Sequence, residues 1–170
     1  MIIENNKNSV TKSIDEELNK VENYIEQALF YARSNTVEKD YYIKKDKLKE
    51  IVNESIKKNK NILIQEKIEI NTHDLDKTVN TDSKWIVFIL NQIIQNSVKY
   101  RNKEIKSTLE IYSKQGKENI ILYIKDNGIG LYLSKKLCNK LGIAIELNSK
   151  YQKETEVKII FPNSSHTNLI

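Results

Sequence analysis

The sequence is poor in residues that several protein classes require. Its single cysteine, Cys138, excludes an intramolecular disulfide framework and a zinc site built from cysteines. Four glycines and one proline are too few for the many tight turns of an all-β barrel or sandwich. The longest apolar run, residues 85–90, is far shorter than the roughly 20 residues that a membrane-spanning helix needs.

Length and charge are those of an ordinary globular protein. The 170 residues suit one domain, or one domain with a helical appendage. There are 28 Lys and Arg against 23 Asp and Glu, a net charge of +5, but the lysines are dispersed among glutamates, so we expect no nucleic-acid partner. The N-terminus turns polar after three residues and no signal-peptide core follows, which predicts a chain of the cytosolic type.

A long amphipathic helix is predicted for residues 11–34. Apolar residues recur there at steps of three and four, separated by Glu and Lys: Ile14, Leu18, Val21, Ile25, Ala28, Leu29 and Ala32. Such a stripe needs a partner, either the chain's own domain or a second helix from another chain.

The remaining chain mixes helices and strands without regular βαβ alternation, which favours the α+β class. Helices are expected over residues 47–59, with Asp46 as the cap, over 82–101 and over 132–141. Strands are expected over residues 41–44, 67–71, 77–80, 107–113, 119–126, 143–148 and 156–161, with hairpins through residues 115–117 and between the last two strands.

Polar side chains gather on one face of the helix predicted over residues 82–101, namely Gln92, Gln95, Asn96, Lys99 and Lys103. An amide oxygen such as that of Asn96 can ligate magnesium, and Lys99 offers a positive charge for phosphate. Tyr100 adds a flat ring beside them. The set suits a nucleotide; the alternative is an ordinary solvated helix face.

A second candidate segment begins at Asp126, at the end of an apolar strand. A carboxylate there can accept a hydrogen bond from an exocyclic amine such as that of adenine, and Gly128 and Gly130 allow the backbone to approach a ligand. The alternative is a simple turn, because Asp-Asn-Gly is a common turn sequence. The helix that starts after Gly130 could bind phosphate at its N-terminus, or could simply pack its leucines inward.

The other candidates for chemistry are weak. We expect Cys138 to be a buried small apolar residue, because no histidine is close in sequence. His73 lies in a polar stretch predicted to be a loop, and His166 lies in a polar tail. Both are expected to be solvated rather than to act as a base or a metal ligand.

In this order, the segments resemble the catalytic region of bacterial sensor histidine kinases, which belongs to the GHKL or Bergerat ATPase superfamily, and in particular its short-sensor, antimicrobial-peptide-responsive branch. Residues 88–100 look like the N box, residues 126–130 like the first glycine box, and residues 131–138 like the helix after the second glycine box. Residues 16–33 are similar to the second helix of the dimerisation and phosphoacceptor hairpin.

The resemblance implies a Bergerat-type α/β sandwich, a mixed sheet with helices on one face, preceded by one long amphipathic helix. Residues 1–36 would be a remnant of the hairpin and residues 37–170 the ATP-binding domain. The implied cofactors are ATP and Mg²⁺. Asn96 would hold magnesium, Lys99 would face the phosphates, Tyr100 would flank the base and Asp126 would accept from adenine.

Further roles follow from the same resemblance. Gly128 and Gly130 would contribute to the nucleotide-binding loop. Gln92 stands where related ATP hydrolases carry a glutamate that activates water. An amide is a poor general base, which fits transfer of phosphate to histidine rather than hydrolysis.

Two features depart from the family pattern. The family inserts a mobile lid between the two glycine boxes, whereas here Gly130 runs directly into Leu131, so the lid is excised, naturally lost or outside the sequence. The first helix has no histidine, so the phosphoacceptor is missing and we expect no autophosphorylation. Both departures predict a fragment with weakened activity.

The predicted function is transfer of the ATP γ-phosphoryl group to a histidine that this chain does not contain. The expected partners are a response regulator, the missing phosphoacceptor hairpin and a second copy through residues 11–34. The resemblance implies the cytoplasmic portion of a membrane-anchored protein. One alternative is a non-catalytic interaction module that binds a partner protein through the N-terminal helix. Another, a serine kinase of the anti-sigma type, fits the first helix less well.

Overall fold

The computed structural model describes residues 42–127, 144–150 and 154–163, together with seven residues near the N-terminus: Thr11, Ile14, Glu17, Leu18, Val21, Ile25 and Ala28. The chain forms two compact units, Met1–Asp40 and Tyr41–Ile170. The seven described residues of the first unit are all helical, within the range predicted for the long helix. They are also all exposed, including the apolar ones.

The second unit is built on a mixed five-stranded sheet in the order β2-β4-β5-β7-β6. The strands are β2 (Glu69–His73), β4 (Thr108–Gln115), β5 (Asn119–Asp126), β6 (Ala144–Lys150) and β7 (Glu154–Pro162). Strand β2 runs parallel to β4, and the other neighbours are antiparallel. A separate antiparallel ribbon joins β1 (Lys44–Lys47) to β3 (Thr78–Thr81).

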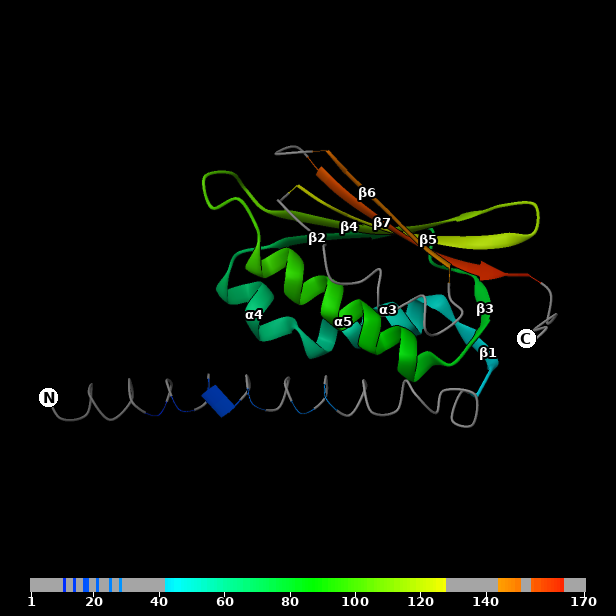
Figure 1. Ribbon diagram of the computed structural model, residues 1–170, viewed down its shortest axis with the longest axis horizontal. Coiled ribbons are helices and arrows are strands. Elements are labelled where there is room, and N and C mark those ends of the chain that lie inside the picture. Colours follow the sequence, from blue (N-terminus) through cyan, green and yellow to red (C-terminus); the bar gives the residue numbers. More distant parts are fainter. Residues whose placement is uncertain are drawn as a thin grey trace, which may run out of the picture. The chain divides into compact units, whose positions relative to one another are not determined.

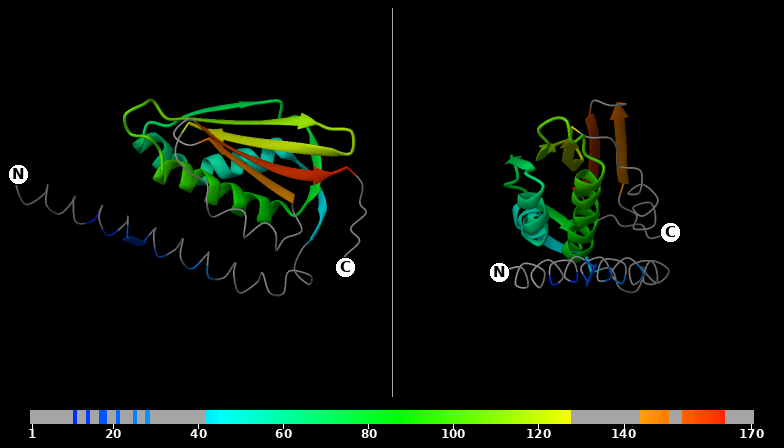
Figure 2. Two further views of the ribbon diagram at one scale, coloured as in Figure 1. Left: turned by 45° about the horizontal axis from the view of Figure 1, so that its top comes forward. Right: turned by 90° about the vertical axis from the view of Figure 1, so that its left-hand side faces the viewer.

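The described helices of this unit lie on one face of the sheet. They are α3 (Leu48–Lys58), α4 (Lys60–Gln65) and α5 (Ser83–Lys99). Figures 1 and 2 show all three on the same side of the five strands. The architecture is therefore α+β, a mixed sheet with helices on one face, as the sequence predicted.

The core lies between this sheet face and the helices. In β5 every second residue is buried, and Leu122 and Ile124 fully so, because successive side chains of a strand point to opposite faces. Helix α5 supplies the opposing apolar side chains at helical spacing, among them Ile86, Leu90 and Ile93. The buried side of α5 packs against the inward-facing side chains of the sheet. This packing fixes the rotation of α5 about its own axis.

Helix α5 begins and ends at well-defined polar contacts. The Asp82 side chain accepts hydrogen bonds from the backbone N–H of Lys84 at 3.0 Å and of Tyr42 at 3.1 Å, which makes it the N-cap of α5, at the position where the sequence predicted the helix to begin. After the last turn, Arg101 donates to the Val98 carbonyl at 2.7 Å and forms an ion pair with Glu66. A cation at the C-terminus of a helix is favourable because the carbonyls there carry partial negative charge.

Several sequence predictions are corrected by the structure. Asp46 does not cap α3: it lies in β1, the N-cap is Lys47, and no side chain caps the helix. The Leu48 N–H instead bonds to the backbone carbonyl of Lys77, so a tertiary contact replaces the cap. Helix α5 ends at Lys99, so Lys103 lies beyond the polar face on which it was placed.

Other boundaries differ more simply. Helix α4 was not predicted, and the strand expected over residues 41–44 is β1, three residues later. Strand β5 has the predicted bounds, and both predicted hairpins are present as antiparallel pairs. The helix predicted over residues 132–141 lies outside the described residues. Within the described part of the chain, no helix has the length and apolar character needed to cross a membrane.

Candidate functional site

A buried hydrogen bond joins the end of α5 to the end of β5. The Ser97 Oγ lies 2.7 Å from the Asp126 Oδ2 and 3.0 Å from the carbonyl oxygen of Ile93. Both Ser97 and Asp126 are only 7% exposed. The contact therefore connects two segments that are 29 residues apart in sequence and that were each predicted to carry ligand-binding residues.

The local sequence explains why both side chains face inward. Asp126 continues the two-residue alternation of Ile120, Leu122 and Ile124, so its side chain points from the sheet toward the helices. Ser97 lies one turn after Ile93, on the buried side of α5. Each is thus a polar residue at a position whose periodicity calls for an apolar one.

The predicted ligand-binding residues of α5 lie in the same region of the helix. Asn96 and Gln92 are half-buried, whereas Lys99 is exposed. The Lys99 Nζ lies 5.0 Å from the centre of the Tyr100 ring, which is at the C-cap and is 43% exposed. The Ser97–Asp126 bond brings the part of α5 that carries these residues next to the end of β5. Gly128 and Gly130 lie outside the described residues.

The region where the end of β5 meets the last turn of α5 is called here the Ser97–Asp126 corner. The next residue, Asn127, holds the end of β5 to the start of β4. The Asn127 Oδ1 accepts a hydrogen bond from the Thr108 N–H at 3.0 Å, and its Nδ2 donates to the Lys106 carbonyl at 2.7 Å. Both bonds connect the residues after β5 to the start of β4. The backbone that leaves Asp126 is therefore held at a defined position rather than by a local turn alone.

Sequence reasoning missed two polar residues at this corner. Ser97 was not singled out, although its spacing from Ile86, Leu90 and Ile93 places a hydroxyl on the apolar side of the helix. Thr155 is fully buried and is the register partner of Asp126 across β5 and β7. Thr155 lies two residues before Val157 and four before Ile159, so the alternation of β7 turns all three side chains inward. This spacing is the signal that could have identified it.

The chemistry of this corner favours a ligand that donates hydrogen bonds and carries phosphate. An ionised carboxylate can only accept hydrogen bonds, so Asp126 is matched to an amine or amide N–H. The Asn96 oxygen suits a hard cation and the Lys99 ammonium suits phosphate. No group of three or more His, Cys, Asp or Glu side chains that could hold a metal occurs among the described residues. A single amide oxygen suits magnesium that keeps most of its ligands as water and phosphate oxygens, which is its usual mode in nucleotide sites.

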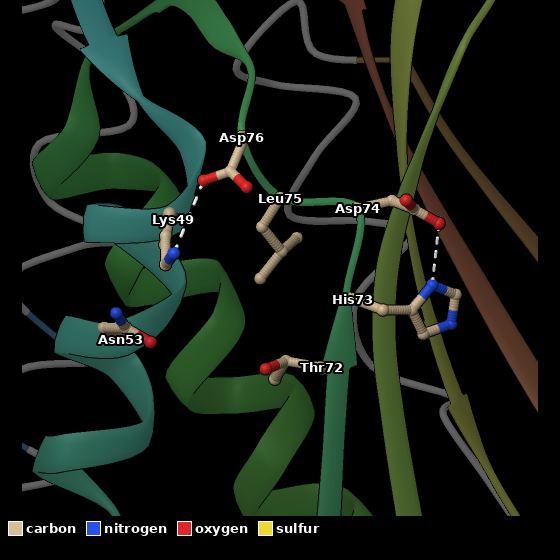
Figure 3. Close-up of a pocket in the computed structure, with 7 residues that line it drawn as sticks. All are labelled: Lys49, Asn53, Thr72, His73, Asp74, Leu75 and Asp76. Atoms are coloured by element: carbon tan, nitrogen blue, oxygen red, sulfur yellow. Dashed lines mark hydrogen bonds and ion pairs between the residues drawn. The ribbon is translucent and has the colours of Figure 1, made fainter.

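A second feature is a cavity of about 210 Å³ between α3 and the segment that leaves β2. Figure 3 shows its lining, which is Lys49, Asn53, Thr72, His73, Asp74, Leu75 and Asp76. Its charged groups include two close opposite pairs, Lys49 with Asp76 at 3.4 Å and His73 with Asp74 at 2.8 Å. None of the predicted nucleotide-binding residues lines this cavity.

His73 is the last residue of β2 rather than part of a loop, which corrects the sequence prediction. Its ring stacks on Tyr112 at 4.8 Å between centroids, and Tyr112 stacks on Tyr123 at the same distance. The hydrogen bond to Asp74 raises the pKa of His73, and Glu110 adds to the increase, against a smaller opposing effect of burial. The imidazole is half-exposed but paired, and it lies outside the Ser97–Asp126 corner.

Comparison with known proteins gives a consistent result. The chain is 25% identical to the sensor histidine kinase YxdK of Bacillus subtilis (strain 168), over 95% of this chain and 58% of that protein. It is 26% identical to the sensor protein kinase GraS of Staphylococcus aureus (strain JH1), over 95% of this chain and 55% of GraS. The chain thus spans little more than half the length of these curated relatives. No protein-family model matches it.

Solved structures share the fold. Acinetobacter baumannii histidine kinase AdeS has a TM-score of 0.74 at 18% identity, covering 90% of this chain and 84% of AdeS. Full-length ShkA in complex with AMPPNP has a TM-score of 0.66 at 13% identity, covering 79% of this chain and 34% of ShkA. Histidine kinase ThkA in complex with the response regulator protein TrrA has a TM-score of 0.62 at 16% identity, covering 89% of this chain and 49% of the matched chain.

The alignments with these relatives are longer than the chain itself. Each extends over 193 positions, although the whole chain has only 170 residues. Some positions of the relatives therefore have no counterpart here. In sequence along 95% of its length, and in the fold of its described residues, this chain is similar to the catalytic region of bacterial sensor histidine kinases.

Proposed function

We propose that this chain is the ATP-binding catalytic region of a two-component sensor histidine kinase. The observation that carries the proposal is the buried contact between Ser97 and Asp126. It unites the segment that resembles the N box with the segment that resembles the first glycine box, which is the arrangement that a shared nucleotide site requires. Sequence similarity to sensor kinases over 95% of the chain supports the same function.

Each of the candidate residues would contact a different part of the nucleotide. Asp126, buried at the end of β5, would accept a hydrogen bond from the exocyclic amine of adenine, and Tyr100 would flank the base. Lys99, exposed at the end of α5, would face the phosphates. Gly128 and Gly130 would complete the loop around the nucleotide.

Phosphoryl transfer asks the protein mainly for positioning and charge neutralisation. Asn96 would supply an amide oxygen to Mg²⁺, which would bridge phosphate oxygens and offset their charge. Gln92 would leave the site without a strong base to activate water, because an amide is not basic. The γ-phosphoryl group would then pass to a histidine on a separate phosphoacceptor hairpin and onward to a response regulator.

Weak nucleotide binding is part of this proposal. Alignments of 193 positions against a chain of 170 residues support the absence of a segment that the relatives possess, as the direct junction of Gly130 and Leu131 also suggests. Without a lid, closure over the triphosphate would be lost, while the contacts of Asn96 and Asp126 would remain. The parent protein would be anchored in a membrane with this part in the cytoplasm.

Isothermal titration calorimetry tests nucleotide binding directly. The wild-type protein should bind ADP only when Mg²⁺ is present, and Asp126→Asn should weaken that binding at least about tenfold, because the amide cannot serve as a charged acceptor. His73→Gln is a matched control, since it alters a polar residue outside the Ser97–Asp126 corner. Equal heats from wild type and Asp126→Asn would contradict the role of Asp126.

A transfer assay separates the two kinase hypotheses. Radiolabelled ATP is offered with a separate histidine-bearing hairpin or with a serine-containing protein substrate. We expect slow labelling of the histidine only. Labelling of serine would favour the anti-sigma type of kinase instead.

The N-terminal helix supports a second candidate function, an interaction module. Four apolar residues of this helix follow one another at steps of four, three and four residues, and each is 51–60% exposed: Ile14, Leu18, Val21 and Ile25. This is the spacing of a coiled-coil seam, so the helix would pair with a second copy of the chain. Sedimentation should show self-association that Leu18→Glu abolishes. Self-association together with no nucleotide binding would favour the interaction module over the kinase.

A further inference from the structure

We infer that Ser97 is a positioning residue that holds the Asp126 carboxylate as an acceptor for the amine of adenine, and so sets the preference for adenine over other purines. The inference rests on the proposed function and adds to it a residue that does not itself touch the nucleotide. Its basis is the hydrogen bond of 2.7 Å between two side chains that are each 7% exposed.

The position of the Ser97 proton decides what this contact does. A hydroxyl has one proton, and two acceptors lie within reach: Asp126 Oδ2 at 2.7 Å and the Ile93 carbonyl at 3.0 Å. Hydrogen bonds from a hydroxyl to a carboxylate are typically about 2.5–2.7 Å long, so the shorter contact has the length of a charge-assisted bond. With Asp126 ionised, a Ser97 proton that pointed to Ile93 would leave two oxygen lone pairs facing each other at 2.7 Å. Ser97 therefore donates to Asp126.

This donation has a consequence for the ligand. It holds the carboxylate in one orientation and favours its ionised form, which can only accept hydrogen bonds, so a group that meets Asp126 must be a donor. The amine at position 6 of adenine is such a donor, whereas guanine carries an oxygen at that position. A site built around a hydrogen bond discriminates strongly against analogues that cannot make it, because its buried polar group is then left unpaired.

The test compares two ligands that differ only in the amine. ADP and purine riboside 5′-diphosphate, which lacks the amine at position 6, are titrated into the 170-residue protein with Mg²⁺. In wild type, ADP should bind more tightly. Ser97→Ala should weaken ADP binding roughly fivefold, the effect of one ordinary hydrogen bond, and weaken the amine-free ligand less than about twofold. The preference for ADP should therefore narrow.

Further variants distinguish positioning from a general loss of structure. Ser97→Thr keeps a hydroxyl and should restore most of the preference. In an Asp126→Asn background, Ser97→Ala should cause little additional loss, because residues that act through one contact are not additive. Ser55→Ala is a matched control: Ser55 is a fully buried helix serine whose hydroxyl donates to the Val87 carbonyl at 3.1 Å. It should lower thermal stability without changing the ligand preference.

The outcomes separate this inference from the proposed function. Absence of magnesium-dependent ADP binding in wild type would overturn both. If wild type prefers ADP and Ser97→Ala retains the full preference, the role of Ser97 is wrong while the nucleotide site stands. Equal weakening of both ligands by Ser97→Ala would likewise overturn the role of Ser97.

Discussion

At the scale of single residues, His73 links local charge to stability. Its imidazole stacks on Tyr112 and bonds to Asp74 at 2.8 Å, with Glu110 at 3.4 Å from the other ring nitrogen. The Asp74 hydrogen bond is the main cause of the raised pKa of His73. A group whose pKa is higher in the folded state than in the unfolded state binds its proton more tightly when folded, so protonation favours the fold.

We therefore predict a loss of stability on raising the pH through the His73 titration. The contribution is fully present below the unfolded pKa of about 6.5 and disappears as the pH passes the raised folded value. Urea unfolding from about pH 5.5 to about pH 8.5 should show this decrease, and His73→Gln should flatten it. An NMR titration of the ring protons checks the direction of the pKa shift. The same pH dependence in wild type and variant would assign the effect to other groups.

At the scale of elements, α5 is the part that brings the candidate site together. Its N-terminus is capped by Asp82, its buried side packs on the sheet, and its last turn reaches Asp126 through Ser97. Helix α3 packs beside it, and the C-cap residue of α3, Asn59, donates from its Nδ2 to the Asn91 Oδ1 at 2.9 Å. Because buried polar groups must be paired, this contact favours one register of the two helices.

Removal of the α5 cap should be costly. Asp82→Ala loses the acceptor for the Lys84 N–H and for the Tyr42 N–H. We expect a loss of about 1–2 kcal/mol in the free energy of unfolding, the usual range for an N-cap. Asp82→Asn keeps an acceptor oxygen and should lose less than half as much. Urea unfolding of the three proteins measures this order, and equal losses in both variants would show that the cap hydrogen bonds contribute little.

At the scale of the whole molecule, the two compact units have different sources of stability. The second unit has its own sheet, helices and apolar core, with side chains such as Leu122 and Ile159 fully buried. The described apolar side chains of the first unit are exposed. A unit that buries its own core does not depend on an appended helix for its stability.

Deletion of residues 1–40 should therefore leave the second unit folded. We expect the far-ultraviolet circular dichroism of residues 41–170 to retain the sheet and helix signals, and the midpoint of thermal unfolding to change by less than about 4 °C, which corresponds to less than about 1 kcal/mol for a domain of this size. Magnesium-dependent ADP binding should also be retained. An unfolded deletion product would show that the N-terminal helix completes the core.

Much of this fold follows from periodicities in the chain. The alternation of Ile120, Leu122 and Ile124 predicts β5 and its buried face, and the helical spacing of Ile86, Leu90 and Ile93 predicts α5 and its buried side. Asp82 marks the start of α5 because a side-chain cap is a local interaction between residues two apart. Local geometry depends on local sequence, so these features can be read from the chain.

Contacts between distant segments cannot be read in this way. Leu48 bonds to Lys77 in place of a side-chain cap, and Ser97 meets Asp126 across 29 residues. Such contacts depend on how sheet and helix pack, which is a property of the whole core rather than of any one segment. The sequence alone thus determined that β5 and α5 form and which apolar side chains they turn inward. Only the tertiary structure decided that the hydroxyl of α5 and the carboxylate of β5 would share one buried corner, because their distance is set by the packing of α5 on the sheet.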